Sequence, residues 1–191
     1  MCLARELPVR FTVQEFLSWA PNDGRRYELV DGQPRAMAPG STIHGFLQNE
    51  LGSLIRDHLR RNHSKCEVIA NPGVVPRLLT AHNFRIPDLG VTCSPIRPGD
   101  SVLADPVLLI EILSPSNQAD TWSNVWTYTS LPSVREILVL HIARIAADLL
   151  RRGADDTWPS DTESVPAGEL VLQSIDFRVA LADLYARTGL T

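Results

Sequence analysis

The sequence is poor in lysine and cysteine, and it contains no long apolar run. Lys65 is the only lysine among 18 basic residues, the others being arginines. Because arginine stays protonated at ordinary pH and is a poor general base, a mechanism that needs a lysine must use Lys65 or do without one. Cys2, Cys66 and Cys93 are odd in number and widely spaced, which indicates neither a disulfide framework nor a zinc site.

Further absences exclude other classes of protein. No stretch approaches the roughly 20 apolar residues that cross a bilayer, and residues 1–6 form no apolar run of signal-peptide length, so we expect a cytoplasmic protein. A net charge of −4 argues against a protein that binds nucleic acid over its whole surface, although a local basic groove stays compatible with it. Neither a Gly-x-Ser-x-Gly element nor a glycine-rich phosphate loop occurs, so serine hydrolases and nucleotide-binding proteins have no motif in their favour.

What is present is the composition of an ordinary globular domain. Hydrophobic residues make up 44% of the chain and charged residues 21%, which is close to the average of folded domains. At roughly 150 residues per domain, this length predicts a single domain, residues 1–191, that can bury a core without disulfides. No internal repeat or low-complexity run divides it.

Hydrophobic periodicity and turn residues predict a mixture of helices and strands. Helices are expected over residues 13–20, capped by Thr12, and over 42–61, 120–130 and 182–187. Strands are expected over residues 26–33, which end in an Asp31-Gly32 turn, and over 35–38, 66–70, 73–76, 85–91, 107–113, 136–141, 146–152, 170–173 and 177–181. Residues 146–152 and 170–173 are expected to pair as a hairpin. The pattern indicates one mixed α/β domain, with helices against a curved sheet.

Three acidic residues stand out because of the strands that carry them. Glu111 interrupts the almost wholly apolar strand Val107–Leu113, where an unpaired charge is expensive to bury, so its carboxylate must be paired, protonated or metal-bound. Asp88 and Glu28 pose the same question on two other strands. If the three converge, they offer the oxygen ligands that a hard divalent cation prefers. The competing interpretation is an ion-pair network with the abundant arginines.

Several segments occur in the order and at the spacing of a known family. They are residues 27–32 (Tyr-Glu-Leu-Val-Asp-Gly), Ser41 with His44, Pro87-Asp88, and residues 111–116 (Glu-Ile-Leu-Ser-Pro-Ser). Together with the closing segment 172–185, they resemble the Uma family of restriction-endonuclease-like proteins, over a core of about residues 12–186. The resemblance implies a PD-(D/E)xK-type nuclease core, in which helices flank a mixed, curved sheet.

The resemblance also implies a function, the hydrolysis of DNA phosphodiester bonds with Mg²⁺ or Mn²⁺. Such a metal polarises a phosphate oxygen and generates hydroxide from bound water. In this scheme Asp88 and Glu111 bind the metal, with Glu28 and the main-chain carbonyl of Ile112 as further ligands. His44 would contact a phosphate or the metal-bound water, whereas taken alone it is typical of a hydrogen-bonded histidine at the edge of a core.

One departure from the family pattern concerns the lysine of these nucleases. Two residues after the glutamate this chain has Leu113, and the alternative position, four residues after Asp120 and four before Tyr128, is Asn124. Residues 120, 124 and 128 share one helical face, opposite a face that contains Trp126. Asparagine donates hydrogen bonds but brings no positive charge, and losing one such electrostatic group typically costs about 10²–10³-fold in rate.

Two interpretations of function therefore stay open. In the first, the chain is an endonuclease with Asn124 as an auxiliary catalytic residue; in the second, it is an inactive copy that binds nucleic acid or a protein partner. His141 favours the second, because the family tends to have an aspartate there. Arg85 and Arg135 are candidates to replace the lysine as a phosphate clamp. Because cutting both strands of a duplex is easiest for a two-fold dimer, a homodimer is expected.

A group of basic residues lies at the end of the long predicted helix. Arg56, Arg60, Arg61 and Lys65 belong to this group. Near a helix C-terminus such cations complement the macrodipole, and this structural role competes with a contact to DNA. The sequence leaves both roles open.

Overall fold

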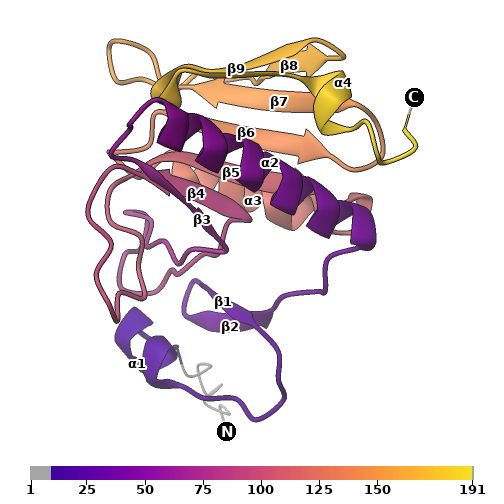
Figure 1. The fold of residues 1–191 in the computed structure, drawn as a ribbon. Helices are drawn as coiled ribbons and strands as arrows, with labels where there is room; N and C mark the ends of the chain where they lie inside the picture. The colour runs from indigo at the N-terminus through magenta and orange to yellow at the C-terminus, as the bar shows by residue number, and fades with distance from the viewer. Residues whose placement is uncertain (1–9, 191) are drawn as a thin grey trace, which may run out of the picture.

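The computed structural model describes residues 10–190 and has a six-stranded mixed sheet at its centre (Figure 1). The strand order is β3-β4-β5-β6-β7-β8. In chain order the strands are β3 (Glu67–Ala70), β4 (Leu89–Thr92), β5 (Pro106–Leu113), β6 (Glu136–His141), β7 (Ala146–Arg151) and β8 (Glu163–Pro166). Of these, β5 and β6 pair in parallel and the other neighbours are antiparallel. Residues 1–9 lie outside the described residues. They include Cys2 and the segment for which no signal peptide was predicted.

Two helices cover the two faces of the sheet. In Figure 1, α2 (Thr42–Arg61) crosses in front of the strands and α3 (Gln118–Tyr128) lies behind them. On the first face Ile55 packs in one apolar cluster with Ile110, and on the second Val125 belongs to another cluster. Because both faces are covered, β5 and β6 are apolar almost throughout. The mixed α/β fold expected from the sequence is confirmed.

The hairpin that the sequence predicted forms, and it lies below the sheet in Figure 1. It consists of β1 (Tyr27–Val30) and β2 (Gln33–Ala36), paired in antiparallel register. Asp31 and Gly32 connect the strands with φ values of 49° and 81°, the left-handed conformation that favours Asp-Gly in a tight turn. Main-chain hydrogen bonds in both directions between Leu29 and Phe84 attach the hairpin to the rest of the fold.

The short helix α1 (Val13–Ser18) starts at the predicted N-cap, Thr12. Thr12 accepts a hydrogen bond from the N–H of Glu15, whose carboxylate accepts one from the N–H of Thr12 in return. This reciprocal capping box satisfies donors that an isolated helix end leaves unpaired. Phe16 then anchors the helix in a third apolar cluster, with Phe84.

The C-terminal segment consists of β9 (Glu169–Leu172) and β10 (Phe177–Ala180), which pair as a two-stranded sheet, and of the one-turn helix α4 (Leu181–Leu184). It lies at the top of Figure 1, where β9 and α4 are labelled. Short 3₁₀ turns at Pro115–Asn117 and Gln173–Ile175 precede α3 and β10. The apolar residues of this segment join the cluster that α2 covers.

Several expected strands and faces were wrong. Residues 73–76 form no strand beyond a bridge from Val74 to Arg85, and β4 begins only at Leu89. Prolines 72, 76 and 87 explain this, because a residue without an N–H cannot donate to a strand ladder. The expected hairpin of residues 146–152 with 170–173 does not form, since β7 pairs with β8 and β9 pairs with β10. Trp126 was expected on the apolar face of α3, but it is 43% exposed and does not belong to the buried face of this helix.

The expectation of no disulfide was also wrong. Cys66 and Cys93 form a disulfide, although 27 positions separate them in the sequence. Cys66 directly precedes β3 and Cys93 directly follows β4, and the register pairs their neighbours Glu67 and Thr92. The pairing of the strands therefore brings the two cysteines together, which spacing alone does not reveal. Among the helices of residues 10–190, none combines the length and hydropathy of a membrane span.

Candidate active site

Asp88 and Glu111 face each other across two central strands. Leu89 on β4 pairs with Ile110 on β5 in antiparallel register, so the next pair in this register is Asp88 with Glu111. Both acidic residues are buried. The main-chain N–H of Ile112 donates a hydrogen bond of 2.7 Å to Oδ2 of Asp88 and ties the aspartate to β5. Two carboxyl groups from distant parts of the chain therefore meet in one buried place.

The first turns of α2 hold Asp88 from another direction. Nε2 of His44 lies 3.2 Å from Oδ2 of Asp88, and Nε2 of Gln48 donates a hydrogen bond of 2.7 Å to the main-chain oxygen of Asp88. His44 and Gln48 are four residues apart and so lie on the same face of the helix. The N-cap Ser41 accepts a hydrogen bond from the N–H of His44, which fixes where this face begins.

Glu111 is held by a tyrosine of α3. The hydroxyl of Tyr128 donates a hydrogen bond of 2.6 Å to Oε1 of Glu111. Burial raises the pKa of Glu111 well above its usual range, and the negative charges of Asp88 and Glu28 raise it further, against the opposing effect of the Tyr128 hydrogen bond. Burial and the charge of Glu111 likewise raise the pKa of Tyr128. Without a cation, Glu111 is therefore a group that prefers to keep its proton.

Glu28 projects from β1 toward the same region. Its Oε1 accepts a hydrogen bond of 2.7 Å from the N–H of Ile86, and Nδ2 of Asn124 lies 3.2 Å from Oε2 and 3.4 Å from Oε1. Burial raises the pKa of Glu28, partly offset by these hydrogen bonds and by the positive charge of Arg85. Asn124 and Tyr128, one turn apart on α3, thus reach Glu28 and Glu111 respectively.

Arg85 is the cation that the structure places beside this acidic group. It is buried, and its guanidinium donates a hydrogen bond to the main-chain oxygen of Leu29, while its Nε has no hydrogen-bond partner among residues 10–190. Burial lowers the pKa of Arg85, and the charge of Glu28 opposes this effect. Arg135, the other predicted substitute for the lysine, instead pairs with Asp156 at an exposed position. Its N–H binds the oxygen of Val107, at the other end of β5 from Glu111.

The pair of Asp88 and Glu111 fits a divalent cation. In the described part of the chain, neither carboxylate forms an ion pair with arginine or lysine, and two adjacent like charges need a proton or a cation between them. No group of three or more His, Cys, Asp or Glu side chains within residues 10–190 is placed to hold a metal, and Glu28 is bonded to Ile86 and Asn124. Mg²⁺ is commonly held by one or two carboxylates, with water and substrate phosphate completing the shell.

Most of the predicted site residues come together. His44 contacts Asp88, and Asp88 lies opposite Glu111. Glu28 is bonded to Ile86 and Asn124 at the edge of this pair, and Ile112 donates its N–H to Asp88. Gln48 and Ile86 were missed, since a helix-surface glutamine and a main-chain N–H carry no sequence signal. The position of Tyr128 was recognised, but its bond to Glu111 was not.

Two residues near the predicted site make other contacts. Nε2 of His141 lies 2.7 Å from Oδ2 of Asp148 on the neighbouring strand β7. Asp120, at the start of α3, lies 3.5 Å from the guanidinium of Arg35 in an exposed ion pair. Neither residue has a direct contact with Asp88 or Glu111.

Comparisons with known proteins bear on the family and the fold of this chain. The uncharacterized protein slr1290 of Synechocystis sp. is 29% identical to this chain over 151 residues, which cover 78% of each protein. A solved structure from Anabaena variabilis, described as a "putative nuclease belonging to DUF820", superposes with a TM-score of 0.74 and covers 93% of this chain and 99% of its own; at 17% identity this likeness establishes the fold alone. A sequence model of the Uma2 family, described as "Putative restriction endonuclease", matches residues 13–182. The chain therefore belongs to the Uma2 family, as its motifs predicted.

Proposed function

We propose that the protein is an Mg²⁺- or Mn²⁺-dependent endonuclease that hydrolyses DNA phosphodiester bonds. The observation that carries this proposal is the buried pair of Asp88 and Glu111, set opposite each other and without an ion pair to any arginine or lysine of residues 10–190. Such a pair is unfavourable in a purely structural role, because each ionised carboxylate raises the free energy of the other. The nuclease descriptions of the family and of the Anabaena variabilis protein support the same activity.

In this proposal each residue of the site has a separate task. Asp88 and Glu111 hold the metal, which when bound polarises a phosphate oxygen and lowers the pKa of water. His44 and the N–H of Ile112 orient Oδ2 of Asp88, and the hydroxyl of Tyr128 orients Oε1 of Glu111. Glu28 contributes further negative charge at the edge of the site, and the carbonyl of Ile112 remains a candidate ligand.

The lysine position decides how active such a site is. Asn124 donates to Glu28 and brings no positive charge, so the group that would stabilise developing charge on the phosphate is missing there. We propose that Arg85, buried next to Glu28, supplies part of this charge. The second candidate function, an inactive fold that binds nucleic acid or a protein partner, is favoured by the same engagement of Asn124 with Glu28.

Plasmid cleavage in the presence of Mg²⁺ or Mn²⁺ tests the proposal. Wild-type protein should nick or linearise plasmid DNA, and Asp88→Asn should abolish this activity while leaving the circular dichroism spectrum unchanged. In a calorimetric titration, Mn²⁺ should bind the wild type and fail to bind the Asp88→Asn variant. Equal, negligible heats for both proteins would contradict the metal site.

The substitution Asn124→Lys separates the two candidate functions. If the site is an attenuated nuclease, a lysine there should increase cleavage by about 10²-fold, the effect typical of restoring one electrostatic group. A variant that folds and binds Mn²⁺ but gains no cleavage would favour the non-catalytic function. The matched control is Asn117→Lys, which adds the same charge just before α3.

We also propose that the protein acts on DNA as a homodimer. Two copies related by a two-fold axis place two identical sites on the two strands of a duplex. Light scattering of the purified protein, with and without a short duplex, measures the mass directly. A monomer under both conditions would contradict this part of the proposal.

A further inference from the structure

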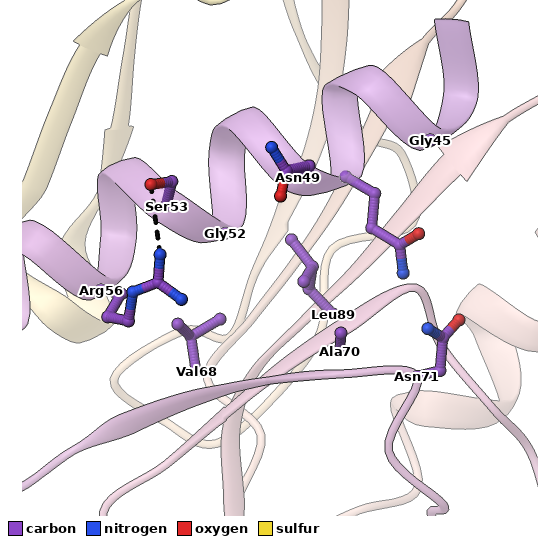
Figure 2. A pocket seen from close by; sticks show the side chains of 10 residues that line it. Gly45, Asn49, Gly52, Ser53, Arg56, Val68, Ala70, Asn71 and Leu89 are labelled. Atoms are coloured by element: carbon purple, nitrogen blue, oxygen red, sulfur yellow. Dashed lines mark hydrogen bonds between the residues drawn. The ribbon is translucent and has the colours of Figure 1, made fainter. Parts of the chain in front are cut away.

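A groove of about 280 Å³ runs between α2 and the edge strand β3, on the face of the sheet that α2 covers (Figure 2). It exists because small residues line it: Gly45 and Gly52 leave the helix surface without side chains, and Ala70 presents only a methyl group from the strand. An added Cβ at Gly45 would meet nothing within 4 Å, whereas one at Gly52 would lie 3.3 Å from Leu89. The groove is therefore open near Gly45 and shallow at Gly52.

The polar residues that line the groove can donate hydrogen bonds, and no acidic side chain belongs to the lining. Gln48, Asn49 and Asn71 contribute amides, Ser53 a hydroxyl and Arg56 a guanidinium, and none of the lining residues is an aspartate or glutamate. Nη2 of Arg56 donates a hydrogen bond of 3.3 Å to Oγ of Ser53, as Figure 2 shows. This bond holds the guanidinium group beside Ser53 in the lining of the groove. In a protein with a net charge of −4, a lining of positive sign and many donors indicates an anionic ligand that carries several acceptors.

One end of the groove meets the acidic site. Gln48, which lines the groove, is the residue that donates to the main-chain oxygen of Asp88. Leu89, in the floor, directly follows Asp88, and Gly45 directly follows His44. From Gly45 to Arg56 the helix rises by about 16 Å, a length that spans a few nucleotides.

We propose that this groove binds the sugar–phosphate backbone of the nucleic-acid strand next to the phosphate that is cleaved, with Arg56 as its phosphate contact. The inference rests on the proposed nuclease function and adds the path of the strand to it. Because β3 is an edge strand, an extended peptide is the competing occupant. The continuity with the Asp88–Glu111 pair and the cation at the far end favour the nucleic acid.

Fluorescence anisotropy with a short, labelled single-stranded DNA tests the groove, using the full chain in EDTA so that no metal-dependent cleavage occurs. Arg56→Gln should weaken binding roughly five- to tenfold and reduce the slope of log affinity against log salt by about 0.7, the value expected for one phosphate contact. Arg60→Gln removes the same charge one turn further along α2, outside the lining, and should change the affinity less than twofold. Equal effects of the two variants would overturn the proposal.

A second variant fills the groove without removing charge. Gly45→Leu adds a side chain where a Cβ has no neighbour, and leucine favours a helix more than glycine does, so the melting temperature should rise while DNA affinity falls. Unchanged affinity in this stabilised variant would overturn the proposal, as would a wild-type protein that does not bind the oligonucleotide. The readouts are independent: loss of cleavage in Asp88→Asn tests the nuclease, whereas oligonucleotide affinity of Arg56→Gln and Gly45→Leu tests the groove.

Discussion

Glu111 on β5 and Glu136 on β6 are both buried, with exposed fractions of 7% and 1%, yet their surroundings are opposite. The two strands are adjacent and parallel, and Glu136 pairs in register with Leu108, three residues before Glu111. Glu136 lies at the start of β6, whereas Glu111 lies near the end of β5. The carboxylate of Glu136 is paired with a cation inside the protein, whereas that of Glu111 lies opposite another acid.

Glu136 is satisfied by the protein itself. Nε of Arg151 donates to its Oε1 at 2.9 Å, and the N–H groups of Gln173 and Ser174 donate to the carboxylate at 3.0 and 2.7 Å. Arg151 is the cross-strand partner of Glu136 on β7. These contacts connect the main sheet to the C-terminal segment. Because a cation and two further donors already bind the carboxylate, Glu136 has a structural role.

The side chain that binds Glu111 is the hydroxyl of Tyr128, whereas the side chain that binds Glu136 is the guanidinium of Arg151. The cross-strand neighbour of Glu111 is another acid, Asp88, and Glu111 accepts a hydrogen bond from the neutral hydroxyl of Tyr128. Burial alone therefore does not single out a candidate for metal binding. What distinguishes Glu111 is burial together with a like-charged neighbour, Asp88, whose contacts in the described chain are His44 and main-chain or amide groups rather than arginine or lysine.

The largest expected effect is that of Glu111→Gln on activity. If Glu111 holds the metal, cleavage per folded molecule should fall by about 10³-fold, or about 4 kcal/mol in the activation barrier. The urea midpoint of the metal-free variant should not fall, because the change removes a poorly satisfied acid. Retained cleavage would remove Glu111 from the proposed mechanism.

Arg151→Gln should produce the opposite result. It leaves Glu136 buried without its cation, so the free energy of unfolding should fall by about 3 kcal/mol, while cleavage per folded molecule stays near the wild-type value. The control is Arg178→Gln, which breaks the exposed pair with Glu169 and should change stability by less than about 1 kcal/mol. Equal losses in both variants would show that the buried pair is not special.

The pH dependence of stability sharpens the same comparison. The raised pKa of Glu111 means that the folded, metal-free protein keeps a proton that the unfolded chain releases near pH 4.3. Stability should therefore fall by up to about 1.4 kcal/mol per pH unit as the pH rises from there through the folded pKa. Urea unfolding of wild type and Glu111→Gln in EDTA isolates the effect, since the variant lacks this proton. Parallel curves for the two proteins would contradict the raised pKa.

The smallest expected effect is that of Tyr128→Phe. The ring keeps its packing and only the hydrogen bond to Oε1 of Glu111 is lost, so cleavage should fall by about tenfold or less, within the roughly 1–1.5 kcal/mol of one hydrogen bond. Because that bond lowers the pKa of Glu111, its loss should move the onset of Mn²⁺ binding to higher pH. Calorimetric titrations at several pH values measure this shift, and an unchanged onset would argue that Tyr128 only packs.

Much of the site could be predicted because the signal was local. An acid in the middle of an apolar strand singled out Glu111, and the order of short motifs added Glu28, His44 and Asp88. The helix register predicted that Asn124 and Tyr128 share a face. The partner of β7 could not be predicted, because β8 is a short polar segment, Glu-Ser-Val-Pro, with no alternation of apolar residues.

Hydrophobic period, caps and the Asp31-Gly32 turn act between neighbours in the chain, so they could be recognised along with the residues that compose the site. Which charges meet depends on how distant segments pack. The register of β4 against β5 places Asp88 beside Glu111, that of β6 against β7 places Arg151 beside Glu136, and the pairing of β3 with β4 joins Cys66 to Cys93. These contacts depend on strand pairing between distant segments, and a shift of one residue would send every side chain to the other face.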